Sequence, residues 1–179
     1  MKRIRLGLAP TRRAIFSAPA AVEYAGRTRQ RLKELGIDYV DIEDISADGL
    51  LHDETDEIRI AEKFRREGVD GLFLPHTNFG TEYECARLAK RLNVPVLLWG
   101  PRDECPDENG MRLRDSQCGL FGMSRQLQRM NVPFTYIENC RIEDPIFTEG
   151  FLRFVGVACA VKNFKGMRVA QVGMRPKPF

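Results

Sequence analysis

Two patterns of hydrophobic and polar positions alternate along the chain. Short apolar runs are separated by longer segments in which apolar residues recur every three or four positions. The first pattern is typical of β-strands that are covered on both faces, and the second is typical of amphipathic helices. The runs that we expect to form strands are 4–9, 37–42, 69–74, 94–99, 134–137 and 167–173.

The segments between these runs predict helices over 21–35, 54–67 and 116–130, one that opens at Thr81, and a long one from 144. Thr81 and Glu84 have the spacing of a capping box, in which each side chain accepts a hydrogen bond from a free backbone N–H. The apolar spacing also places Val22 and Ile58 on the buried faces of the first two helices.

Strict alternation of strands and helices indicates a parallel sheet with helices on both faces. Right-handed crossovers leave few topologies, and about five such units favour the strand order 2-1-3-4-5. We therefore predict a flavodoxin-like or Rossmann-like α/β fold with three αβα layers. Residues 100–115 form a polar segment longer than an ordinary connection, which is typical of a functional or a loosely held loop.

Polar residues follow the two strands between which the strand order reverses. In open α/β sheets, ligands bind beyond the carboxyl ends of the strands at this point. We expect the segments that follow the first and third strands to face each other across one crevice that binds a small molecule. The candidate ligand-contacting residues are Arg12, Arg13, His76, Asn78, Phe79, Trp99 and Arg102.

Five of these candidates also have a purely structural interpretation. His76 has the position of a histidine that is hydrogen-bonded at a strand end, and Asn78 that of a residue that stabilises the following turn. Trp99 ends an apolar strand and is equally consistent with the core. Arg12 and Arg13 are also consistent with a solvated surface.

Composition excludes several classes of protein. The chain has 179 residues, enough for one ordinary domain, and a net charge of +3 with Lys and Arg dispersed among Asp and Glu, which argues against nucleic-acid binding. The sequence has no apolar run near the ~20 residues that cross a membrane. Five cysteines without a C-x-x-C pair favour a reducing environment, so we expect a cytoplasmic protein.

Motifs for catalysis or metal binding are also missing from the sequence. It contains no G-x-G-x-x-G and no Walker motif. The two histidines, His52 and His76, lack suitably spaced carboxylates, so we expect no metal site. Cys118 lies near a helix start, where a thiol pKa is lowered, but no general base accompanies it. Buried packing is the better interpretation of Cys118, and we predict no catalytic residue.

Several long stretches resemble one family. DGLFLPHTNFGTE (70–82), PVLLWGPRDE (95–104), the stretch 112–145 and MRVAQVGMRPKPF (167–179) are similar to the amino-terminal region of the L-fucose/L-arabinose isomerase family. That resemblance implies a parent enzyme that converts an aldose to its ketose with a divalent metal, typically Mn²⁺, held by two carboxylates and a histidine. The family's metal ligands belong to later domains.

The resemblance therefore divides the chain into an amino-terminal domain, 1–166, and the truncated opening strand of a second domain, 167–179. It implies that this chain alone is inactive and holds no cofactor, whereas the full-length parent binds Mn²⁺. The implied substrate is a monosaccharide of the L-fucose or D-arabinose type.

The resemblance also implies roles for individual residues. Family members form trimers or hexamers, in which Phe79 would supply an aromatic wall to the substrate pocket of a neighbouring subunit. Arg12 or Arg13 would contact sugar hydroxyls. Two alternatives remain: a stand-alone flavodoxin-like module that binds a sugar or another small molecule, and a small independent enzyme that uses Cys118 or His76.

Overall fold

The computed structural model describes residues 4–174, in which five strands alternate strictly with five helices. They follow the order β1 (Leu6–Leu8), α1 (Ala18–Glu34), β2 (Tyr39–Val40), α2 (Glu54–Glu67), β3 (Gly71–Pro75), α3 (Glu82–Leu92), β4 (Val96–Trp99), α4 (Ser116–Arg129), β5 (Thr135–Tyr136) and α5 (Pro145–Lys165).

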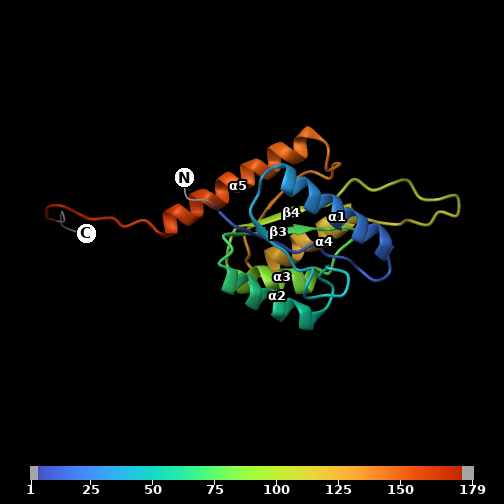
Figure 1. Ribbon diagram of the computed structural model, residues 1–179, viewed down its shortest axis with the longest axis horizontal. Helices are drawn as coiled ribbons and strands as arrows, with labels where there is room; N and C mark the ends of the chain where they lie inside the picture. The colour runs from blue at the N-terminus through green and yellow to red at the C-terminus, as the bar shows by residue number, and fades with distance from the viewer. Residues whose placement is uncertain (1–3, 175–179) are drawn as a thin grey trace.

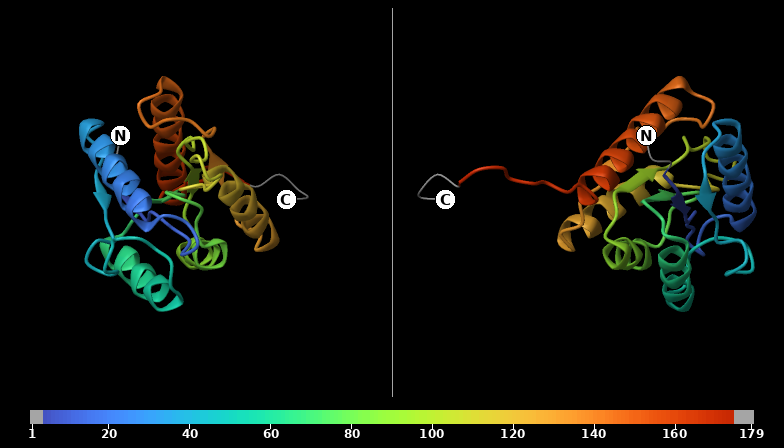
Figure 2. Two further views of the ribbon diagram at one scale, coloured as in Figure 1. Left: turned by 90° about the vertical axis from the view of Figure 1, so that its right-hand side faces the viewer. Right: turned by 60° about the vertical axis from the view of Figure 1, so that its left-hand side comes forward.

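The five strands form one parallel sheet in the order β2-β1-β3-β4-β5. In its centre, Gly7 of β1 pairs with Leu72 of β3, and Phe73 of β3 pairs with Leu97 of β4. Helices α1 and α5 cover one face of this sheet, and α2, α3 and α4 cover the other (Figures 1 and 2). The predicted three-layer flavodoxin-like fold is confirmed.

A separate hydrophobic core fills the space on each side of the sheet. Leu72, Leu74 and Leu98 face α2, α3 and α4, where they join Phe64 and Met123. On the other side, alternate strand residues meet the aromatic face of α5; this core includes Leu6, Leu8, Phe73, Leu97, Trp99, Phe147, Phe151 and Phe154. The alternation of side chains along each strand thus decides which core a residue enters.

Two predicted details of the helices differ in the structure. Helix α1 begins earlier than expected, because Ser17 acts as its N-cap and its hydroxyl accepts a 3.2 Å hydrogen bond from the N–H of Ala20. The predicted Thr81–Glu84 capping box does not form. Instead, Oγ1 of Thr11 accepts a 3.1 Å hydrogen bond from the N–H of Thr81, the group that Glu84 was expected to satisfy.

Predictions for two inward-facing side chains are wrong. Val22 and Ile58 are exposed, whereas Ala21 and the neighbouring Glu57 are buried. The carboxylate of Glu57 faces α3 and forms ion pairs with Arg91 (2.9 Å) and Arg87 (3.4 Å). Because burial disfavours the charged carboxylate, the pKa of Glu57 is raised in spite of these two cations.

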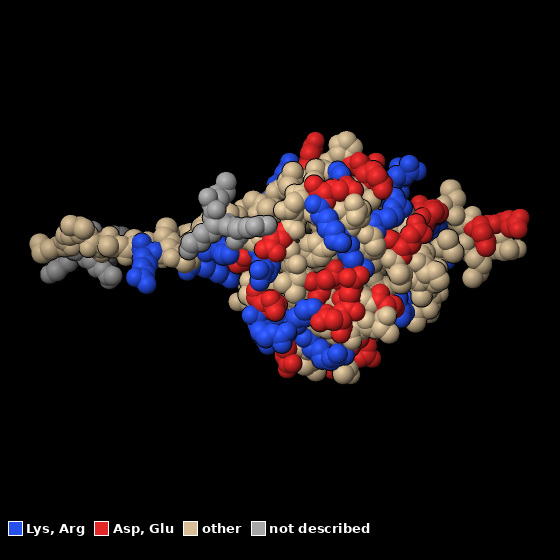
Figure 3. Space-filling view, in the orientation of Figure 1, with Lys and Arg blue, Asp and Glu red and all other residues tan. Residues whose placement is uncertain are grey.

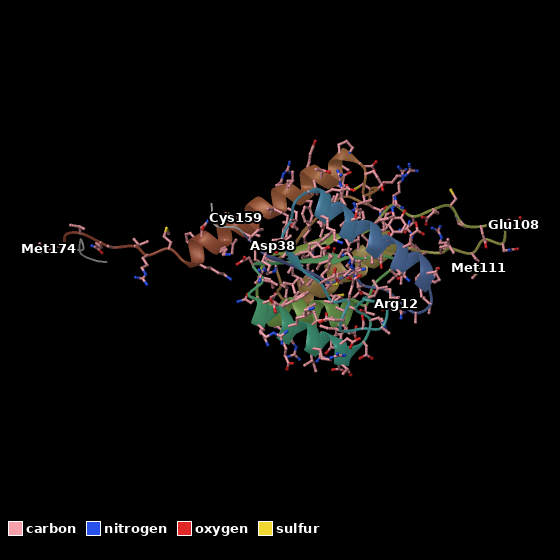
Figure 4. The ribbon with its side chains drawn as sticks, in the orientation of Figure 1. Arg12, Asp38, Glu108, Met111, Cys159 and Met174 are labelled. Atoms are coloured by element: carbon pink, nitrogen blue, oxygen red, sulfur yellow. The ribbon has the colours of Figure 1, made fainter. Side chains whose placement is uncertain are left out.

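The loop between β4 and α4 has a fixed base and a projecting tip. Arg114 is buried, and its guanidinium donates to Glu104 and to the carbonyl of Arg102 (2.8 Å) while lying 3.8 Å above the ring of Tyr24. Glu108 lies at the far tip, which extends away from the domain (Figure 4). Residues 100–115 are therefore anchored at their two ends and not uniformly loose.

The predicted strand 167–173 is not formed. Residues 167–174 have irregular backbone and are exposed, and they extend away from the sheet (Figure 1). The edge strands of the sheet are β2 and β5, so this segment does not join the sheet. Residues 175–179, the rest of the predicted second-domain segment, lie outside the described residues. The division of the chain into two domains stays a prediction.

Charged side chains of both signs are interspersed on the face of the molecule in Figure 3, with no large area of one sign. Among the helices of the described residues, none has the length and apolarity that crossing a membrane requires.

Candidate functional site

The loops that follow β1 and β3 lie side by side at the carboxyl end of the sheet, as the sequence predicts. The N–H of Thr11 donates to the carbonyl of Pro75 at 2.9 Å, and the N–H of Thr77 donates to the carbonyl of Thr11 at 3.0 Å. These backbone hydrogen bonds join the two loops directly where they leave the sheet.

Asn78 joins three loops from a buried position. Its Oδ1 accepts from the N–H of Arg13 at 2.8 Å, and its Nδ2 donates to the carbonyls of Arg13 and Ser17 at 3.2 Å each. Its own carbonyl accepts a 2.7 Å hydrogen bond from the N–H of Asp115 at the start of α4. Asn78 thus has a structural role, but it joins other loops and does not stabilise the following turn as its structural interpretation proposed.

His76 is also fully buried, beneath the turn at Gly80. Its Nδ1–H donates to the carbonyl of Leu74 at 3.1 Å, and its Nε2 has no hydrogen-bond partner. Burial lowers the pKa of His76 to about 4, so the ring is neutral at pH 7. A Cβ at Gly80 would lie 2.5 Å from Cδ2 of this ring, so the turn and the imidazole are in direct contact.

Trp99 lies in the core and does not reach the surface of the loops. Its ring centroid is 4.8 Å from that of Phe147 and 6.5 Å from that of Phe73. Although the N–H of His76 donates to the carbonyl of Trp99 at 2.8 Å, alternation along the strands places their side chains on opposite faces of the sheet. The structure therefore does not bring these two predicted site residues together.

Arg12 is held by the loop that precedes α2. Its Nε donates to Asp48 at 2.6 Å, and its Nη2 donates to Nε2 of His52 at 3.0 Å. These contacts orient the guanidinium toward the domain itself and occupy two of its donor groups.

Arg13, Phe16 and Phe79 form a partly exposed surface that we call the rim platform. The rings of Phe16 and Phe79 are stacked, with centroids 5.4 Å apart and planes at 10°. The guanidinium of Arg13 lies 4.5 Å above the Phe79 ring and forms an ion pair with Glu82. The Phe79 ring therefore makes both an aromatic stacking contact and a cation–π contact.

Phe16 was not among the residues predicted for this site. Its signal was present, because an aromatic residue follows the first strand just as Phe79 follows the third. Arg102, by contrast, was predicted for this site but lies away from the rim platform, in the walls of two other cavities.

The described residues hold no group of three or more His, Cys, Asp or Glu that could bind a metal ion. Within residues 4–174 the donor set that the isomerase resemblance requires is therefore missing, and the metal does not fit here.

Cys118 and Cys85 do not have the properties of nucleophiles. Contrary to the prediction, Cys118 is exposed, and a hydrogen bond with Asp115 raises the pKa of its thiol. Burial raises the pKa of the Cys85 thiol to about 12. Both thiols are protonated at neutral pH, which argues against an independent enzyme that uses Cys118.

Comparison with known families settles which family this is. A model described as "Fucose/sulfoquinovose isomerase, N-terminal domain" matches residues 7–165. The chain belongs to this family. The resemblance of the sequence to this isomerase family is thus confirmed. The match covers all five strands and all five helices of the described residues, except for Leu6, the first residue of β1.

No curated protein matches the isomerase-family domain. Similar solved structures include a ribose 5-phosphate isomerase from Thermotoga maritima, with 12% identity over 86% of this chain and 98% of that chain and a TM-score of 0.37. Another is an ABC transporter solute binding protein from Bacillus halodurans with bound myo-inositol, with 8% identity over 92% of this chain and 72% of that chain and a TM-score of 0.35.

Proposed function

We propose that this chain is the amino-terminal domain of a metal-dependent sugar ketol isomerase, whose substrate is an aldose of the L-fucose or D-arabinose type. The observation that carries this proposal is the family match over residues 7–165. The domain shapes part of the substrate pocket and the subunit contacts. In the full-length parent, Mn²⁺ is held by residues outside this chain.

The rim platform is the part of the domain best suited to this role. It lies at the carboxyl end of β1 and β3, where ligands of α/β proteins bind. Phe79 supplies an aromatic wall, and its contacts with the Phe16 ring and the Arg13 guanidinium hold it in place. The neighbouring Ile15 is 80% exposed, which supports a contact with another domain or subunit at this surface.

The remaining properties of the parent follow from the same proposal. It assembles as a trimer or hexamer, so that the rim platform faces the pocket of a neighbouring subunit. A cytoplasmic location is consistent with the five cysteines, all of which are free.

Substitution of Phe79 in the full-length parent tests the proposal. We expect Phe79→Ala to raise KM for the aldose about tenfold with little change in kcat, because the lost wall contacts substrate and transition state alike. The bound Mn²⁺, measured by elemental analysis, should not change. Tyr83→Ala is the matched control, since this exposed ring on α3 lies outside the platform and contacts only Arg87 among the ring interactions of the described residues. An unchanged KM in the Phe79 variant would contradict the proposal.

A further inference from the structure

A cavity lies at the same end of the sheet as the rim platform but over β4 and β5. It has a volume of about 730 Å³, within the range of about 300–1,000 Å³ that is usual for small-molecule sites. Its walls come from Arg102 after β4, the first two turns of α4, and the residues of and after β5. None of the rim platform residues lines it.

Two aromatic side chains in this cavity are unusually exposed. Phe121 on α4 is 66% exposed and Tyr136 on β5 is 67% exposed, although both belong to residue types that are normally mostly buried. Aromatic rings left in water beside a cavity can pack against the C–H faces of a ligand ring and so lose this unfavourable exposure.

Three polar side chains of the cavity are free to bind a ligand. Among the described residues, the side chains of Arg102, Gln117 and Glu138 have no hydrogen-bond or ion-pair partner, and all three line the cavity. Their chemistry is mixed: a donor-only guanidinium, an acceptor-only carboxylate and an amide with both functions. A hydroxyl group both donates and accepts, so neighbouring hydroxyls on one molecule satisfy this set.

The cavity is also fixed in shape before a ligand binds. Asn139 donates to the carbonyls of Gly100 (2.9 Å) and Pro101 (3.1 Å), which ties the segment after β5 to the segment after β4. The N–H of Arg102 donates to the carbonyl of Cys140 at 3.0 Å, which closes the same junction. A wall that is held in place loses little entropy when a ligand binds.

An anionic ligand does not suit this cavity. The charges of Arg102 and Glu138 cancel, so the lining has no net charge. The start of α4, which would otherwise attract a phosphate, is already occupied by Asp103. Its carboxylate accepts from the N–H of Ser116 at 3.1 Å and from the N–H of Gln117 at 3.4 Å.

We propose that this cavity binds a neutral polyhydroxylated molecule, a sugar or a polyol, between Phe121 and Tyr136, with Arg102, Gln117 and Glu138 contacting its hydroxyls. The site is separate from the rim platform. It does not depend on the proposed isomerase function.

Titration of the 179-residue chain with D-glucose, D-ribose and myo-inositol, followed by nuclear magnetic resonance, tests this inference. We expect saturable shifts in the side-chain amide of Gln117 and in the ring protons of Phe121 and Tyr136 with at least one of these probes. Phe121→Ala should weaken binding about tenfold. Tyr83→Ala, which removes an exposed ring from α3, should leave the affinity unchanged.

Glucose 6-phosphate separates a neutral from an anionic preference. Wild-type protein should bind it more weakly than D-glucose, and Glu138→Gln should reduce this difference, because the repelling carboxylate is gone. The inference would be overturned by tighter binding of glucose 6-phosphate to the wild type, by shifts confined to Phe16 and Phe79, or by the absence of saturable shifts with all three neutral probes.

Discussion

Several polar residues of the stretch 75–80 hold the loops together instead of facing a ligand. The hydroxyl of Thr77 donates to the carbonyl of Thr11 at 2.8 Å, Asn78 joins three loops, and His76 supports the turn at Gly80. Only Phe79 of this group is partly exposed. The buried residues therefore position the rim platform, because their hydrogen bonds fix the loop that carries Phe79.

The buried imidazole of His76 predicts a pH dependence of stability. The pKa of His76 is about 4 in the folded protein and 6.5 as the ordinary value, so the unfolded chain takes up a proton first as the pH falls. Stability that is fully present above pH 6.5 should thus be lost progressively toward pH 4. Between pH 6.5 and about pH 5 the loss should be roughly 1.5 kcal/mol.

Urea denaturation at several pH values measures this effect. The His76→Gln variant serves as the control, because it lacks the titrating imidazole. Any pH-independent loss of stability from the substitution does not affect the comparison of pH slopes. The variant should show a shallower decline of the unfolding free energy over this pH range. Identical pH slopes in the two proteins would refute the assignment.

At the scale of elements, close contact between α4 and the loop after β3 depends on a glycine. A Cβ at Gly119 would lie 1.9 Å from the carbonyl oxygen of Phe79, a distance that requires the backbone to move. Gly156 on α5 offers a matched contrast, since a Cβ there would meet no atom within 4 Å. The two positions have the same helical backbone but opposite surroundings.

Alanine at these two glycines should have opposite effects. We expect Gly119→Ala to lower the unfolding free energy by about 1–3 kcal/mol through forced displacement of α4 or the Phe79 loop. Gly156→Ala should raise it by about 0.5–1 kcal/mol, since alanine is the better helix former. Thermal denaturation of both variants checks the prediction, and equal effects would show that the contact at Gly119 is unimportant.

At the scale of the whole molecule, the described residues form a five-stranded sheet with its helices but contain no metal-binding group. We expect the isolated 179-residue chain to show no aldose–ketose turnover with Mn²⁺ present. Its thermal midpoint should not change on addition of Mn²⁺, because a ligand that does not bind the folded state cannot stabilise it.

Both readouts have clear contrary results. Turnover by this chain, or a thermal midpoint that rises with the Mn²⁺ concentration, would place the metal within the chain and contradict the proposed division of labour. Saturable sugar binding at the rim platform without a parent enzyme would instead favour the stand-alone binding module.

A feature of the fold or the site could be predicted from the sequence when residues close together in the chain determine it. Strand order followed from local alternation and chain connectivity, and so did the adjacency of Arg13 and Asn78. The exposure of Ile58 and the burial of Glu57 did not follow, because apolar spacing does not reveal that Arg87 and Arg91 lie opposite on α3. The predicted capping box failed for the same reason, since Thr11 comes from a distant part of the chain.

The sequence by itself determined the sheet, its order and the family, because hydrophobic periodicity and motif order are properties of consecutive residues. Tertiary structure alone decided which polar side chains remain available. His76 and Asn78 are buried, while Phe16 stacks on Phe79 and Arg102 lines a cavity elsewhere. A buried polar group must find its partner, and for Thr77 and Asn78 that partner comes from another loop, which local pattern cannot specify.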